Sequence, residues 1–186
     1  MRIISGSFKG ITLDYLKNST TRPLKDIVKE NIFNIINHSN LIKINLKNSN
    51  VLDSYSGIGS FGLECLSRGA KKVSFVEENK EAIKILEKNV LLLSAMNKSK
   101  IYRGKMENYF DTNKREKFDL IFFDPPFADN EFIKNLNLIK KNLMYCPDHL
   151  IIIHREKIAE DNLDDFINVI IKKRYGRSQI FFGNFI

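Results

Sequence analysis

Residues 118–127 read Phe-Asp-Leu-Ile-Phe-Phe-Asp-Pro-Pro-Phe, and the fold can be predicted outward from this stretch. The unbroken apolar run at 120–123 is typical of a parallel strand that helices cover on both faces. Asp124 follows at the carboxyl end of that strand, where open α/β sheets place their ligand crevices. Pro125 and Pro126 then end the strand, because proline has no N–H to donate to a neighbouring strand. We therefore predict a buried strand that ends in a rigid polar loop.

The loop after this strand carries groups that could hold a planar amine. Asp124 provides a carboxylate acceptor, and the two prolines are expected to leave their carbonyls free to face a ligand. Phe127 adds a flat apolar ring beside the carboxylate. Together these groups suit a planar ligand with an exocyclic –NH2 group. A plain proline turn after a strand is the alternative, and segments upstream bear on the choice.

A glycine-rich segment, Asp-Ser-Tyr-Ser-Gly-Ile-Gly-Ser-Phe-Gly at 53–62, lies between a predicted strand and a predicted helix. Glycines at such a turn let a ligand approach the backbone closely. Asp53 would repel a pyrophosphate but attract an ammonium group. Glu77 ends the next strand, where an acidic residue accepts hydrogen bonds from a ribose diol. These features predict binding of S-adenosylmethionine, whereas an Asx-turn for Asp53 and a solvated position for Glu77 are the simpler alternatives.

The rest of the chain alternates strand and helix patterns, which predicts an α/β fold. A short hairpin is expected at 2–16 and an amphipathic helix at 24–38, before the first strand of the alternating region. Further strands are expected at 51–53, 73–77, 101–103, 118–124 and 150–154, with a closing antiparallel pair at 167–174 and 178–182. We divide the chain into an N-terminal RNA-binding extension, 1–40, and a methyltransferase domain, 41–186.

Length and composition limit the classes of protein that need consideration. The chain has 186 residues with 43% hydrophobic content, enough for one packed domain with a small appendage. Its apolar runs have strand length and its start lacks a hydrophobic signal core, so we expect a cytoplasmic protein without a membrane partner. The three histidines show no metal spacing, and we predict no metal site and structural or surface roles for them. We also expect a monomer.

The net charge of +8 and pI of about 9.4 favour a polyanionic partner, although lysine-rich coding bias could produce the same balance. One basic cluster falls in the first 29 residues, and from it Arg2, Lys9 and Arg22 are the candidate RNA-binding residues. Arg22 could equally be an ordinary charge at a helix start. A second basic cluster occupies positions 172–177.

Several segments together resemble a known family. They are Arg-Ile-Ile-Ser-Gly at 2–6, Arg22-Pro23 with the helix behind it, Val-Leu-Asp at 51–53, Gly-Leu-Glu-Cys-Leu-Ser-Arg-Gly-Ala at 62–70, Phe-Val-Glu at 75–77 and Asp-Pro-Pro-Phe at 124–127. In this order they are similar to the bacterial small-subunit ribosomal RNA guanine-N2 methyltransferase D family, a branch of the class I methyltransferases. The glycine and proline motifs indicate only the superfamily, and the N-terminal and Ser-Arg-Gly-Ala segments favour the narrower family.

The resemblance implies a Rossmann-like fold with a seven-stranded, mostly parallel sheet whose last strand is antiparallel. It implies methyl transfer from S-adenosylmethionine to N2 of a guanine in 16S rRNA, perhaps presented in an assembling small subunit. The implied catalytic residues are Asp124, Pro125, Pro126 and Phe127. The implied cofactor-binding residues are Asp53, Ser54, Gly57, Gly59, Glu77, Lys105 and Met106. The chain departs from the superfamily at Lys105 and Met106, where an Asp or Asn is common, so we expect main-chain contacts to the adenine there.

Three other functions remain open from the sequence. An adenine-N6 DNA methyltransferase also uses an Asp-Pro-Pro-aromatic motif, although this chain has little room for a DNA-recognition region. An NAD-dependent oxidoreductase would use the glycine loop, but Asp53 opposes a pyrophosphate there. A non-catalytic RNA-binding assembly protein would not need the Asp124 motif.

Overall fold

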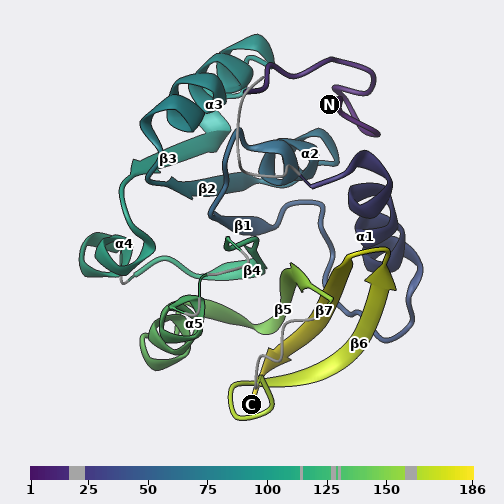
Figure 1. Ribbon diagram of the computed structural model, residues 1–186, viewed down its shortest axis with the longest axis vertical. Coiled ribbons are helices and arrows are strands. Elements are labelled where there is room, and N and C mark those ends of the chain that lie inside the picture. The colour runs from purple at the N-terminus through teal and green to yellow at the C-terminus, as the bar shows by residue number, and fades with distance from the viewer. Residues whose placement is uncertain (17–23, 114, 127–128, 130, 158–162) are drawn as a thin grey trace.

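The computed structural model describes residues 1–16, 24–113, 115–126, 129, 131–157 and 163–186 (Figure 1). These residues form one seven-stranded sheet in the order β3-β2-β1-β4-β5-β7-β6. The strands are β1 Asn50–Ser54, β2 Lys72–Glu77, β3 Ser99–Arg103, β4 Phe118–Phe123, β5 Tyr145–Glu156, β6 Ile167–Tyr175 and β7 Ser178–Phe185. Neighbours from β3 to β5 pair in parallel, and β7 runs antiparallel to both β5 and β6. The predicted Rossmann-like sheet with an antiparallel last strand is confirmed.

Helices cover both faces of the sheet (Figure 1). The helices are α1 Asp26–His38, α2 Ser60–Ser67, α3 Lys80–Leu92, α4 Met106–Asn113 and α5 Phe132–Lys141. Side chains alternate along β4, so that Leu120 and Phe122 join a core with α1, α2 and α3. Ile121 and Phe123 join a second core with α4 and α5. This alternation explains the unbroken apolar run of β4, because each of its faces is covered by helices.

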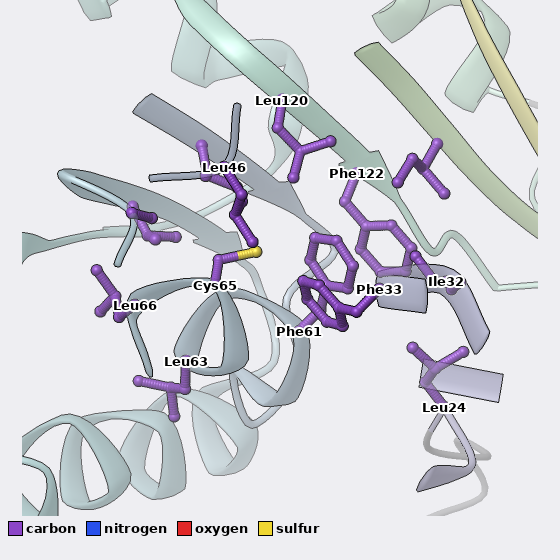
Figure 2. Close-up of a cluster of buried hydrophobic side chains, with 14 of the residues drawn as sticks. Leu24, Ile32, Phe33, Leu46, Phe61, Leu63, Cys65, Leu66, Leu120 and Phe122 are labelled. Atoms are coloured by element: carbon purple, nitrogen blue, oxygen red, sulfur yellow. The ribbon is translucent and has the colours of Figure 1, made fainter. Parts of the chain in front are cut away.

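The N-terminal region shares the first core with the sheet. The ring of Phe61 from α2 stacks between Phe33 of α1 and Phe122 of β4, with centroid distances of 5.1 and 3.9 Å (Figure 2). Ile3 and Leu13, which flank the first turn of the chain, are also fully buried in this core. Contacts therefore fix the N-terminal region on the sheet, and the functional division at residue 40 stays a prediction.

The predicted N-terminal hairpin was wrong in its extent, since it contains a single antiparallel bridge, between Arg2 and Thr12. The main-chain N–H groups of Ile4 and Ser5 instead donate to the carboxylate of Glu64, at 2.8 and 3.0 Å. Backbone groups that a ladder would need are therefore used to attach the segment to α2. Elsewhere β5 is longer than predicted, and no helix among the described residues is long and apolar enough to cross a membrane.

Candidate active site

Three carboxylates meet at the carboxyl edge of the sheet, on the neighbouring strands β2, β1 and β4. Asp53 is 1% exposed and accepts a hydrogen bond from the N–H of Gly62 at 2.9 Å. Burial raises the pKa of Asp53 well above its ordinary value, the Gly62 hydrogen bond opposes this, and the charges of Asp124 and Glu77 raise it further. Because the three groups interact electrostatically, the edge of the sheet favours a cationic ligand.

The glycines after β1 serve different purposes. Gly57 has φ +54°, and a side chain there would meet nothing within 4 Å, so the loop is open at this point. Gly59 has φ +83°, and an added Cβ would lie 2.3 Å from Leu86 Cδ1. At Gly62 it would lie 2.4 Å from Phe75 Cε1 and 2.9 Å from the Asp53 carboxylate. Gly57 thus leaves room for a ligand, whereas the other two allow α2 and α3 to pack closely.

Glu77 organises the loops around this opening. Its carboxylate accepts main-chain N–H groups from Gly57 at 2.7 Å, Glu78 at 3.0 Å and Asn79 at 2.8 Å. The Asn79 side chain caps α3, as predicted. These bonds hold the glycine loop against the start of α3, on the side where a ribose would reach Glu77.

The loop after β3 joins the same edge, because the Gly104 N–H donates to the Glu77 carbonyl at 2.8 Å. Lys105 is exposed at the start of α4, and its carbonyl accepts the N–H of Asn108. The Met106 side chain is buried in the second core. The side chain of Met106 therefore has a structural role, and main-chain groups near these two residues remain the candidates for adenine contact.

Ser54, at the end of β1, is fully buried, and its hydroxyl has no hydrogen-bond partner within the described part of the chain. Buried polar atoms of this kind are rare and often mark a functional site. With the clustered carboxylates and the open space at Gly57, this hydroxyl fits a ligand that combines polar groups with positive charge. The residues therefore fit S-adenosylmethionine, which carries a sulfonium and an ammonium group, better than a pyrophosphate cofactor.

Asp124 is held by a histidine on the adjacent strand. His154 Nδ1 lies 2.7 Å from Asp124 Oδ1, and His154 Nε2 lies 2.9 Å from the hydroxyl of Ser178 at the start of β7. A carboxylate can only accept, so Nδ1 carries the hydrogen in this pair. The His154 side chain is 6% exposed and that of Asp124 is 23% exposed. The histidine thus anchors one carboxylate oxygen from within the protein, while the carboxyl group still reaches the surface.

An arginine supports the loop that follows Asp124. Arg155 is 1% exposed, donates from Nη1 to the Pro126 carbonyl at 3.1 Å, and lies 4.5 Å from the ring centroid of Phe132. The Asp129 N–H donates to the same carbonyl at 2.8 Å. The expectation of a free carbonyl was therefore wrong for Pro126. Phe127 lies outside the described residues.

Sequence analysis missed the supporting roles of His154 and Arg155. Both directly follow the apolar run of β5, at the carboxyl end of a parallel strand. The same position had singled out Asp53, Glu77 and Asp124 on their strands. The signal was therefore present in the sequence, but the rule was not applied to β5.

The candidate RNA-binding residues are not all brought to this edge. Arg2 is exposed, and its carbonyl accepts the ammonium of buried Lys29 at 3.0 Å, which also donates to the hydroxyl of Ser60 at the start of α2. Lys9 instead follows a segment held by Ser67 at the opposite end of α2. An eight-residue helix is about 12 Å long, so Lys9 lies toward the other edge of the sheet. Arg22 lies outside the described residues.

Comparison with known proteins identifies the family. A family profile described as conserved hypothetical protein 95 matches residues 1–184. The chain belongs to this family. The ribosomal RNA small subunit methyltransferase D of Haemophilus influenzae is 33% identical over 159 residues, which cover 84% of this chain and 79% of the relative. YlbH of Bacillus subtilis is 33% identical over 180 residues, which cover 95% and 94%. The resemblance predicted from the motifs is thereby confirmed.

Solved structures agree with the fold. YhhF from Escherichia coli is similar with a TM-score of 0.83 over 100% of this chain and 97% of that chain, at 23% identity. A likeness at this identity supports the architecture alone. Family and fold together make the protein an S-adenosylmethionine-dependent methyltransferase.

Proposed function

We propose that this protein transfers the methyl group of S-adenosylmethionine to the exocyclic N2 amine of a guanine in small-subunit (16S) ribosomal RNA. The observation that carries the proposal is the Asp124 carboxylate, anchored by His154 beside the cluster formed with Asp53 and Glu77. A carboxylate in this position suits an amine acceptor, and the family relative named above methylates ribosomal RNA of the small subunit according to its name.

S-adenosylmethionine, when bound, supplies a methyl group on a positively charged sulfur. The guanine amine is a weak nucleophile, because its lone pair is delocalised into the ring. Asp124 accepts one amine hydrogen through the oxygen that His154 does not hold, and the Pro125 carbonyl accepts the other. Much of the rate increase then comes from holding the reacting atoms about 3–3.5 Å apart. Asp124 also stabilises the positive charge that develops on the amine, whose extra proton is finally lost to water.

His154 acts through Asp124 and is therefore a positioning residue. Its Nδ1–H fixes one rotamer of the carboxylate, and Ser178 fixes the imidazole. Arg155 holds the Pro126 carbonyl, so the loop between Asp124 and Phe127 keeps a defined path. Phe127 stacks on the guanine, which must leave its own stack at a cost of a few kcal/mol, in order of magnitude.

The remaining contacts are assigned by position. Ser54, Gly57, Gly59 and Glu77 bind the amino-acid and ribose parts of the cofactor with Asp53, and main-chain groups at Lys105 and Met106 contact the adenine. Arg2, Lys9 and Arg22 bind RNA phosphates. Since ribosomal RNA is the substrate, we place the protein in the cytoplasm, as a monomer acting on rRNA or on an assembling subunit.

The test compares wild type with Asp124→Ala on three substrates: naked 16S rRNA, small subunits from cells lacking the protein, and duplex DNA. We expect methylguanosine to be detected by mass spectrometry in rRNA with wild type alone. Calorimetry should give the two proteins S-adenosylmethionine affinities within about threefold, since Asp124 contacts the acceptor in this scheme. Undiminished methylation by the variant would refute the proposed role of Asp124. Methyl transfer to adenine in DNA would replace the proposed substrate.

A further inference from the structure

A second basic surface lies at the turn between β6 and β7. Residues 167–186 contain four basic residues and no acidic residue. We define the basic turn as the exposed side chains of Lys172, Lys173, Arg174 and Arg177, together with that of Lys157. The backbone joins Lys157 to this turn, because its N–H donates to the Arg177 carbonyl at 2.7 Å.

The turn lies at the same edge of the sheet as Asp124. Glu156, at the carboxyl end of β5, pairs with Ser178, the first residue of β7. The Ser178 hydroxyl in turn lies 2.9 Å from His154 Nε2, and His154 binds Asp124. Two side chains therefore separate the turn from the candidate acceptor carboxylate.

The strand order places the turn on the side of Asp124 that the cofactor does not use. The candidate cofactor residues follow β1, β2 and β3, which lie on one side of β4. Strands β5, β7 and β6 lie on the other side, and the basic turn joins the last two. A nucleotide whose base reaches Asp124 would thus have the acidic cofactor cleft on one side and the basic turn on the other. Because a phosphate chain is repelled by the former and attracted by the latter, its path leads over the turn.

Protection of a sheet edge explains only part of this surface. Strand β6 is an edge strand, and lysines on such strands oppose pairing with other molecules. Arg177 and Lys157 are outside β6, so that explanation does not cover them. The side chain of Arg177 is 75% exposed and lies 2.9 Å from Glu156. Ion pairs this exposed contribute little, so a phosphate oxygen can take over the guanidinium.

We propose that the basic turn binds the phosphate backbone of the substrate RNA next to the methylated nucleotide. This rests on the proposed function, since it assumes an RNA substrate. The turn then adds a contact region on the β5 side of the active site, separate from the N-terminal segment. The link through Ser178 and His154 means that RNA held at the turn is held beside the element that orients Asp124.

The experiment neutralises Lys173, Arg174 and Arg177 together as glutamines, with a second variant that changes Lys173 and Arg174 and keeps the Arg177–Glu156 pair. The matched control neutralises Lys71, Lys72 and Lys98, which are exposed at the amino ends of β2 and β3. All proteins are checked by circular dichroism and by S-adenosylmethionine affinity. Steady-state methylation of the RNA or subunit that wild type modifies is then measured at several salt concentrations.

We expect the triple variant to raise the KM for RNA about tenfold or more, with kcat at saturating RNA and cofactor affinity unchanged. Its log–log dependence of RNA affinity on salt should become shallower by about 2, since each lost phosphate contact on a single strand removes about 0.7. The double variant should show an intermediate change. Equal KM and salt slope in triple variant and control would overturn the basic turn as an RNA surface. If wild type methylates no RNA, the proposed function fails first, so the two failures are distinguishable.

Discussion

Replacing His154 by alanine removes the N–H that holds one oxygen of Asp124 and leaves the carboxylate free to rotate. The hydrogen bond is short, at 2.7 Å, and its donor is buried. A hydrogen bond to a charged group contributes about 1.5–3 kcal/mol, and about 1.4 kcal/mol corresponds to tenfold in rate. Since the Asp124 side chain is 23% exposed, water can replace part of the lost bond, which favours the lower half of that range. We therefore expect kcat to fall roughly 10- to 30-fold.

The assay is single-turnover transfer of labelled methyl at saturating cofactor and RNA, with KM measured separately. KM for both ligands should stay within about threefold, because His154 contacts neither of them in this arrangement. His154→Asn is the matched rescue, since an asparagine amide can place an N–H close to the position of Nδ1. Ser178→Ala keeps that donor and removes the second bond of the imidazole, so it should cost less than His154→Ala.

Two results would refute this argument. One is a kcat of His154→Ala equal to that of wild type. The other is a loss in His154→Asn as large as in His154→Ala, because this would indicate lost packing and not a lost donor. Melting temperatures of all variants separate a change in folding from a change in chemistry.

Three further predictions concern the cofactor cleft. Because burial raises the pKa of Asp53, the free protein holds a proton there below that raised pKa, and a cationic cofactor expels it; affinity should rise with pH up to the raised pKa and then level off, and calorimetry in two buffers should detect proton release that Asp53→Asn abolishes. Glu77→Ala, which also frees the Gly57 N–H, should weaken cofactor binding about tenfold or more without a similar loss of kcat, and unchanged affinity by calorimetry would contradict the role of Glu77. Gly62→Ala should lower the free energy of unfolding by about 1–3 kcal/mol in urea titrations, because its Cβ would lie 2.4 Å from Phe75 Cε1, and an unchanged midpoint would argue against this packing.

The sequence by itself determined the parallel sheet and three of its polar strand ends. Apolar runs that stop at Asp53, Glu77 and Asp124 report burial and chain direction, and both are local properties of the chain. Glycine spacing likewise indicated where a ligand approaches, because φ and the lack of a Cβ belong to single residues. The family could be predicted from the same motifs, since each occupies a short contiguous segment.

Only the tertiary structure decided which side chains meet. The bond between His154 and Asp124 joins residues 30 positions apart, and the bond between His154 and Ser178 spans 24. The N-terminal segment was predicted as a hairpin, but its N–H groups find Glu64, about 60 residues away, and the ladder does not form. In each case the outcome depends on competition between partners from distant elements, which sheet order and helix packing settle and the local pattern of residues does not record.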